Sequence, residues 1–556
     1  MAAPVTGTPA DEPATLVAAL LAHARAQPDK TAITLTVGGE TASRSYGALF
    51  DESRRFAGLY RAAGVARGDV VLLFLRSRID AYAAFLGAML IGAVPSYMPC
   101  PSPKQDPALY WAAHAALFAR IRPRAVLAAA PDLAAMRANG LHDDATTAML
   151  DIATRADPLP DGDIILPSPA DPCLLQHSSG TTGLKKGVVL GYGAIDHQVR
   201  ASARALGVTA ADVVVTWLPI YHDMGLIGCT LQPFTLGQTV AALDPFEWAT
   251  DPASMLRAIE THRATICWLP NFAFEHLARA VRQDAFDLSS MRIWNASSEA
   301  CRRATFERFA QRFGVPLERL RTSYGMAETV LATTQSAPDT EVRELVVSDT
   351  ALRAEGIARP PAAGEATVAV MSCGTPIDGL ELRIIGPGGG AAPEGAVGEI
   401  AVRGACLFDG YYRQPALTAE RLIDGWYHTR DIGFIDGGEV FVLGRKDDLI
   451  IVHGRNIYAH EVESAANAVP GVKPGRLVAF GVPNAVLNSE DIVVVAECDA
   501  PDAALRRAIK DGVYQATGFI IREAHLVAPG WLTKTTSGKI SRERNRARYL
   551  AERGSG

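Results

Sequence analysis

The sequence predicts an α/β protein with a large N-terminal domain and a smaller C-terminal domain of mixed α+β character. Its 556 residues exceed what one hydrophobic core usually holds. Continuous apolar runs alternate with helical patterns over residues 14–330, which is typical of doubly wound sheets. A charged run at 446–448 then separates short β elements from a last stretch of about one hundred residues. We therefore expect domains over 1–445 and 446–556.

The first elements fit a doubly wound region. Apolar residues at helical spacing predict helices over 14–25, 46–63 and 80–91, and residues 33–37 with 39–43 read as a hairpin. Residues 70–75 (VVLLFL) form a continuous apolar run, which is typical of a parallel strand buried on both faces. A second short strand follows Gly92. Strand, helix and strand in succession predict a parallel sheet.

The next segment continues the alternation after a break. Residues 95–107 hold five prolines and predict an extended connection. A helix at 109–121, a strand at 125–128 and a helix at 131–138 are expected after it. The strands at 173–176 and 186–190 flank a loop rich in glycine and hydroxyl side chains, which predicts a hairpin.

Four apolar strands are expected to end in polar loops. The strands at 213–218, 264–269 and 293–296 run into PIYHDMG, PNF and SSEA, and SYGMAE at 323–328 ends a fourth. Because the carboxyl ends of parallel strands meet at one edge of a sheet, these loops predict a ligand crevice there.

Shorter β elements follow. Residues 397–404 alternate like a strand with one exposed face, and 426–433 and 438–445 are short β segments, so a small β-barrel is expected. After the charged run we expect a helix at 459–468, strands at 476–481 and 491–497, and helices at 502–517 and 542–553.

Composition and charge disfavour several classes of protein, among them nucleic-acid binders, disulfide scaffolds and membrane proteins. The net charge of -6 disfavours nucleic acid as a partner, and eight scattered cysteines without a CxxC pair argue against a zinc site or a disulfide scaffold. The N-terminus lacks the basic and apolar regions of a signal peptide, and the longest apolar stretch, 81–94, is too short to span a bilayer. We expect a cytoplasmic protein with no membrane span.

The loop between the two hairpin strands has the chemistry of a phosphate site. Residues 178–187 read SSGTTGLKKG, so glycines allow backbone N–H groups to approach an anion while hydroxyls and lysines supply donors and charge. The spacing of glycine and lysine is not that of a Walker A loop. A polar surface turn with solvated lysines is the alternative that this stretch alone leaves open.

Five motifs in a fixed order identify a family. SSGTTGLKKG, SYGMAE, YHTRDIG, GRKDDLI and TSGK together resemble the adenylate-forming superfamily of acyl-CoA synthetases, peptide-synthetase adenylation domains and luciferases. The resemblance runs from about residue 45 to residue 539. It implies a large adenylation domain with two doubly wound sheets and a small β-barrel, followed by a mobile C-terminal domain, and it implies ATP and Mg²⁺ as cofactors.

The resemblance also implies roles for individual residues. The loop Ser178, Ser179, Gly180, Thr181, Thr182, Gly183 and Lys186 would hold the β- and γ-phosphates of ATP. The adenine would lie on Ser297, Ser298 and Glu299 and against Ser323, Tyr324, Gly325, Met326 and Ala327. Glu328, with Thr181, would bind Mg²⁺; Asp431 and Arg445 would bind the ribose; Lys539 would bridge the substrate carboxylate and the α-phosphate. Asp447 would be the hinge, and the acyl pocket would be lined by Trp217, His222, Trp268, Asn271 and Phe272.

The branch of the family decides the acceptor. WLPIYHDMGLIG, LPNFAF and YGMAE look closest to fatty acyl-AMP ligases, which pass an acyl group to the phosphopantetheine thiol of a carrier protein, and residues 329–372 are long enough to hold the insertion of that branch. An acyl- or aryl-CoA ligase that uses free CoA is the first alternative. A degenerate member that only binds acyl groups or nucleotides is the second. Arg430 replaces a usual glycine, so its backbone must avoid a positive φ or accept strain.

Overall fold

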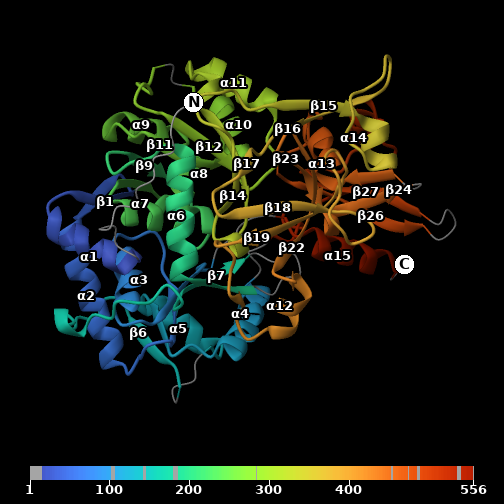
Figure 1. The fold of residues 1–556 in the computed structure, drawn as a ribbon. Helices are drawn as coiled ribbons and strands as arrows, with labels where there is room; N and C mark the ends of the chain where they lie inside the picture. The colour runs from blue at the N-terminus through green and yellow to red at the C-terminus, as the bar shows by residue number, and fades with distance from the viewer. Residues whose placement is uncertain are drawn as a thin grey trace, which may run out of the picture.

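The computed structural model describes residues 15–101, 107–141, 146–178, 186–282, 285–452, 455–473, 475–484, 489–534 and 540–554. It confirms an α/β protein with a separate C-terminal unit, drawn in orange to red in Figure 1. Within the described residues no helix is long and apolar enough to cross a membrane. All eight cysteines are free thiols, as the absence of a CxxC pair predicts.

A nine-stranded sheet forms the centre of the N-terminal part. Its strand order is β17-β14-β13-β12-β11-β9-β10-β1-β2, and the six strands from β13 to β1 run parallel. The strands are β1 (Thr31–Val37), β2 (Glu40–Ser45), β9 (Val213–Thr216), β10 (Thr239–Leu243), β11 (Ile266–Pro270), β12 (Ile293–Ser297), β13 (Leu320–Gly325), β14 (Ala332–Gln335) and β17 (Thr375–Pro376).

Helices and one π-helix connect these strands. They are α6 (Tyr192–Leu206), η2 (Met224–Leu231, the π-helix), α7 (Gln232–Leu236), α8 (Pro245–Thr250), α9 (Ala253–His262), α10 (Asn271–Ala280) and α11 (Arg303–Phe313). The predicted hairpin at the N-terminus is confirmed as β1 and β2, which pair antiparallel. It extends the parallel sheet at one edge through β10.

A second, four-stranded parallel sheet has the order β4-β3-β5-β6. One face of β3 (Val70–Phe74) packs into the main core with α1 (Leu16–Ala26), α2 (Tyr46–Ala62) and α3 (Asp80–Leu90), and the other packs on α4 (Pro107–Ile121) and α5 (Ala130–Ala138). The remaining strands are β4 (Val94–Met98), β5 (Ala125–Ala128) and β6 (Ala148–Asp151). Helices on both faces make this sheet doubly wound. Pro95 lies inside β4 and not in an extended connection, which an edge strand tolerates because it needs no donor on its outer side.

The predicted strands on either side of the phosphate loop are confirmed. β7 (Pro172–Ser178) and β8 (Lys186–Gly191) pair antiparallel, and β20 (Gly410–Tyr411) pairs with β8 on its other side. The loop residues Ser179, Gly180, Thr181, Thr182 and Gly183, and the side chain of Ser178, lie outside what the structure describes.

The small β layer is a five-stranded antiparallel sheet. It contains β18 (Leu380–Ile385), β19 (Gly398–Gly404), β21 (Leu422–Ile423), β22 (Trp426–Asp436) and β23 (Glu439–Arg445), with α12 (Pro415–Arg421) beside it. The prediction of an exposed face for 397–404 is wrong, because Ile400, Ala401 and Val402 are consecutive and all buried. This strand packs on both sides, so its pattern is that of a covered strand.

The C-terminal unit has its own hydrophobic cores on the two faces of one sheet, β26 (Leu477–Asn484), β27 (Ser489–Glu497) and β28 (Ile521–Val527). One face packs on α13 (Ala459–Asn467) and α14 (Ala503–Thr517), and the other on α15 (Arg542–Gly554). The hairpin of β24 (Leu449–Val452) and β25 (Arg455–Tyr458) joins this unit to β23. The remaining hairpin, β15 (Glu344–Ser348) and β16 (Thr367–Met371), lies in the segment 329–372.

Candidate active site

The polar loops that are predicted to line a crevice lie at the carboxyl edge of the nine-stranded sheet. β9, β11, β12 and β13 run parallel, so their final residues lie at the same edge. Asn271 begins α10 directly after β11, Ser297 ends β12 and Gly325 ends β13. The sequence prediction that these strands deliver polar loops to one edge is confirmed.

One end of the crevice holds a tyrosine, a carboxylate and a guanidinium. The Tyr324 hydroxyl donates to Asp431 Oδ2 at 2.7 Å, and Arg445 Nε lies 3.2 Å from Asp431 Oδ1. Asp431 on β22 is paired with Arg445 on β23 in the sheet register, so the backbone holds the two side chains together. Burial raises the pKa of Asp431, and Arg445 and Tyr324 oppose that shift. These are the residues expected to hold adenosine.

The other end holds Glu328, Tyr411 and Lys186. The Tyr411 hydroxyl donates to Glu328 Oε1 at 2.7 Å, and Lys186 Nζ lies 5.3 Å from the centroid of the Tyr411 ring. Burial lowers the pKa of Lys186, whereas the charge of Glu328 raises it. The structure therefore brings a lysine from the hairpin and a carboxylate from the SYGMAE loop together, as expected at a Mg²⁺-triphosphate.

Glu328 has the chemistry of a magnesium ligand. It is 8% exposed, and among the described residues its second oxygen, Oε2, accepts no hydrogen bond. Mg²⁺ in nucleotide sites is held by one or two carboxylates and by phosphate oxygens, so a single carboxylate is sufficient on the protein side. Within the described residues there is no cluster of three acidic, histidine or cysteine ligands. Thr181, the other expected ligand, lies outside the described residues.

The expected adenine platform follows β12. Ser297 Oγ donates to the Ser323 carbonyl at 3.1 Å, and Glu299 Oε2 accepts the Phe272 N–H at 3.1 Å. Ser298 adopts a left-handed backbone with a φ of 71°. This segment is thus tied both to β13 and to the start of α10.

The SYGMAE loop is held tightly behind the crevice. A Cβ at Gly325 would lie 1.7 Å from the Leu331 carbonyl oxygen, so only glycine fits there. Met326 precedes the short 3₁₀ turn Ala327–Thr329, and Val330, a β-branched residue, has a φ of 66°. Backbone strain of this kind is concentrated near functional sites, and here it lies two residues after Glu328.

The two predicted acyl-pocket tryptophans, Trp217 and Trp268, both belong to the main hydrophobic core. Trp217 stacks on Trp248 with ring centroids 3.7 Å apart, and Phe272 lies edge-on at 6.2 Å from Trp217. Trp268 packs against η2, since a Cβ at Gly228 in that π-helix would meet its ring at 3.3 Å.

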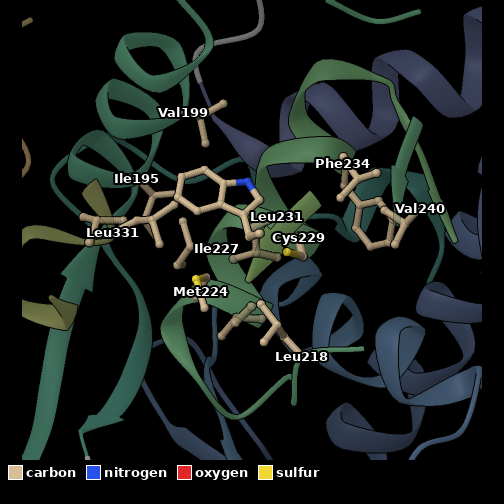
Figure 2. Close-up of a cluster of buried hydrophobic side chains, with 14 of the residues drawn as sticks. Ile195, Val199, Leu218, Met224, Ile227, Cys229, Leu231, Phe234, Val240 and Leu331 are labelled. Carbon is tan, nitrogen blue, oxygen red and sulfur yellow. The ribbon is translucent and has the colours of Figure 1, made fainter. Parts of the chain in front are cut away.

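The π-helix η2 contributes several side chains to this core. Figure 2 shows Met224, Ile227, Cys229 and Leu231 of η2 gathered with Ile195 and Val199 of α6 and with Leu331. Single π-helical segments are frequent at functional sites because the wider turn displaces side chains. Trp268 Nε1 and Asn271 Oδ1 are buried without hydrogen-bond partners within the described residues. They are two polar groups that a ligand could satisfy.

His222 stands at the start of η2. Its Nδ1 lies 2.7 Å from Asp223 Oδ1, and Asp223 also accepts the Met224 N–H at 2.7 Å. The histidine is thus oriented by the residue that caps the π-helix. This arrangement is compatible with its expected place beside the acyl pocket.

The expected hinge residue, Asp447, lies in the 3₁₀ turn η6 (Lys446–Asp448) between β23 and β24. Its carboxylate forms a two-point ion pair with Arg430, with Arg430 Nε at 2.9 Å from Asp447 Oδ2. Arg430 has a φ of 64°, so of the two expected possibilities the backbone accepts strain.

Some functional candidates were missed from sequence, and one prediction stays open. Tyr411 and Tyr427, whose hydroxyl oxygens lie 3.3 Å apart beside Glu328, were not among the predicted site residues, although Tyr427 begins the YHTRDIG motif. Trp248 was likewise not predicted. Lys539 lies outside the described residues, so its role stays a prediction.

Comparisons with known proteins find similar sequences and a similar fold. A family model described as "AMP-binding enzyme" matches residues 20–412. The chain is 31% identical to a "Putative acyl-CoA synthetase" of Caulobacter vibrioides over 91% of this chain and 90% of that protein. It is 30% identical to "Medium-chain-fatty-acid--[acyl-carrier-protein] ligase JamA" of Moorena producens over 68% of this chain and 67% of that protein. A solved structure from a study of fatty acyl-adenylate ligases from E. coli and L. pneumophila superposes with a TM-score of 0.88 at 26% identity, covering 97% of this chain and 98% of that one.

Proposed function

The chain belongs to the family of AMP-binding enzymes and is an adenylate-forming ligase that uses ATP. We propose which acceptor it uses and which of its residues serve each half-reaction. The acid, a fatty or other acyl acid, reacts with ATP to give acyl-AMP and pyrophosphate. The acyl group then passes to the phosphopantetheine thiol of an acyl carrier protein.

The adenylation step is supported by two groups of side chains, one near Tyr324 and one near Glu328, which follow the same strand, β13. Tyr324, Asp431 and Arg445 would hold adenosine, and Lys186 with Glu328 would hold the triphosphate end. Mg²⁺, held by Glu328 and phosphate oxygens, would neutralise charge on the leaving pyrophosphate.

The chain's own residues would supply position and charge. The carboxylate of the acid and the triphosphate repel one another, so attack on the α-phosphorus needs cations nearby and an in-line approach. Lys186 would neutralise the β- and γ-phosphates, and Lys539 would bridge the carboxylate and the α-phosphate. Tyr411 would hold the Glu328 carboxylate through its 2.7 Å hydrogen bond.

The acceptor proposal rests on the segment 329–372. Its β15–β16 hairpin is joined to the C-terminal unit by Arg353, which binds Asp349 within the segment and Glu461 on α13 at 2.8 Å. Arg455 of β25 also reaches Asp349, at 3.0 Å. These contacts hold the segment against the C-terminal unit, and the resemblance to the branch in which such an insertion restricts the CoA-dependent step supports a carrier protein over free CoA as acceptor.

The test is a two-part assay. We expect acid-dependent exchange of labelled pyrophosphate into ATP, followed by loading of a holo carrier protein and little acyl-CoA when CoA is offered instead. No exchange with any acid of a broad panel would favour a non-catalytic binder. Robust acyl-CoA formation would replace the carrier-protein proposal with the CoA ligase.

The lysine assignment has its own test. Lys539→Ala should abolish pyrophosphate exchange while largely sparing transfer from supplied acyl-adenylate, because the bridge from the lysine to the carboxylate and the α-phosphate serves the adenylation step. Lys534→Ala, in the same loop region, is the matched control and should leave both half-reactions near wild type. Equal loss of both half-reactions in Lys539→Ala would contradict this role.

A further inference from the structure

Arg430 occupies a backbone position that disfavours it. In the β19–β22 pairing, Glu399 lies opposite Ile432 and Ala401 opposite His428, so Thr429, Arg430 and Asp431 form a bulge against Ile400. Arg430 has a φ of 64°, a conformation that glycine adopts without strain and a long side chain does not. Its N–H donates to Glu399 Oε1 at 3.0 Å, which holds the strained turn in place.

Stability alone does not account for this arginine. Its ion pair with Asp447 is two-pointed but about one-third exposed on both sides, so water and salt weaken it. The strain of the left-handed backbone opposes this modest gain. A glycine at position 430 would avoid the strain, so the presence of an arginine there needs an explanation other than stability.

The ion pair lies where the two units meet. Lys446 Nζ is 3.5 Å from Glu399 Oε2, and Asp447 binds Arg430, so the first two residues of η6 are held by the N-terminal unit. Asp448 instead binds Arg542 of α15 at 2.5 Å, and Arg542 binds Glu463 of α13 at 2.8 Å. The chain is therefore bound to the N-terminal unit up to Asp447 and to the C-terminal unit from Asp448 onward.

The same bulge also carries the nucleotide site. Asp431 follows Arg430 directly and binds Tyr324 and Arg445. The turn thus connects the side chains expected to hold adenosine with the residue expected to act as hinge.

We propose that Arg430 is a positioning residue whose pair with Asp447 latches the C-terminal unit in the arrangement seen here and thereby sets the balance between adenylation and acyl transfer. This inference rests on the proposed function, in which the C-terminal unit turns about Asp447 between the two half-reactions. The Arg430–Asp447 ion pair must open before the C-terminal unit turns. Removing this pair changes the ratio of the adenylation rate to the transfer rate, and it removes no group that contacts substrate.

The decisive variant is Arg430→Gly, which removes the latch and also relieves the backbone. We expect a melting temperature equal to or above wild type and a ratio of adenylation rate to transfer rate shifted about three- to fivefold, the range that such an ion pair contributes. Arg257→Ala in α9, which breaks an exposed pair with Asp251, is the control and should leave the ratio unchanged.

Two further measurements separate a latch from a merely structural role. The exchanged pair Arg430→Asp with Asp447→Arg should restore the wild-type ratio, and added salt should shift the ratio of the wild type but not of Arg430→Gly. Spin labels introduced at the exposed positions Glu381 and Asp499 should show a broader distance distribution in Arg430→Gly than in wild type.

An unchanged ratio and an unchanged distance distribution in Arg430→Gly would overturn the latch. Failure of the wild type to exchange pyrophosphate would instead refute the proposed function. The distance measurement needs neither acid nor carrier protein, so the two failures are distinguishable.

Discussion

At the scale of single residues, the site includes positions where the backbone conformation or the lack of space restricts which amino acid fits. Val330 and Ser298 have left-handed backbones, and Gly325 lies against the Leu331 carbonyl. All three flank side chains expected to contact the nucleotide or its metal. Strain at such positions persists only where surrounding packing enforces it.

Gly325 gives a direct test of this constraint. Gly325→Ala should lower the free energy of unfolding by about 1–3 kcal/mol, because a Cβ there overlaps the Leu331 carbonyl and must displace β14. The measurement is urea denaturation. Gly388→Ala is the matched control, since a Cβ at Gly388 has nothing within 4 Å and should change stability little. Equal stabilities of the two variants would show that the loop behind Glu328 yields easily.

At the scale of elements, the β15–β16 hairpin is the part that distinguishes this chain's expected acceptor. The connection between its strands is closed by Glu365, which accepts from Arg359 at 2.9 Å through both oxygens and from the Ala362 N–H at 2.8 Å. Ser348 Oγ also donates to this carboxylate. These donors, led by Arg359, lower the pKa of Glu365 to about 2.

The shifted pKa predicts a pH dependence with a definite sign. The pKa of Glu365 is lower in the folded chain than its usual value of 4.5, so its contribution to stability is present above pH 4.5 and is lost as the pH falls toward 2. Glu365→Gln should therefore lower the urea midpoint by a constant amount at neutral pH, and the difference from wild type should shrink below pH 4.5. Glu40→Gln, on the β2 hairpin strand, is the control. A difference that grows on acidification would contradict this assignment.

At the scale of the whole molecule, the two units are joined by charged contacts and by one shared apolar cluster. Arg353 is 5% exposed and binds Asp349 and Glu461, so it links the hairpin of the N-terminal unit to α13. Tyr458 of the C-terminal unit packs with Leu352 and Phe441 of the N-terminal unit, although the C-terminal unit also has cores of its own.

Removal of Arg353 should uncouple the two units. Arg353→Ala leaves the partly buried Glu461 without its cation, whereas Asp349 keeps Arg455, and we expect a loss of about 1–3 kcal/mol in the coupled unfolding transition. Calorimetry should then resolve separate transitions for the two units. Arg308→Ala, which breaks an exposed pair with Glu275, should cost at most about 1 kcal/mol. A single unshifted transition in Arg353→Ala would show that the units are coupled by other contacts.

Much of the architecture followed from local patterns. The apolar run in β3, the alternation of helices and strands, and the polar loops after β9, β11, β12 and β13 were predicted because burial on both faces leaves a continuous hydrophobic signature. The same logic failed for β19, whose alternation suggested an exposed face although Ile400, Ala401 and Val402 are all buried. Burial of that strand depends on sheets distant in sequence.

The sequence by itself determined the fold class, the order of the motifs and the carboxylates and lysines that the chemistry needs, because these are properties of short segments. Only the tertiary structure decided that Tyr411 holds Glu328, that Trp217 stacks on Trp248, and that Arg430 binds Asp447 across a bulge. Those contacts join side chains from separate strands, and their geometry follows from sheet register and packing, which no local pattern encodes.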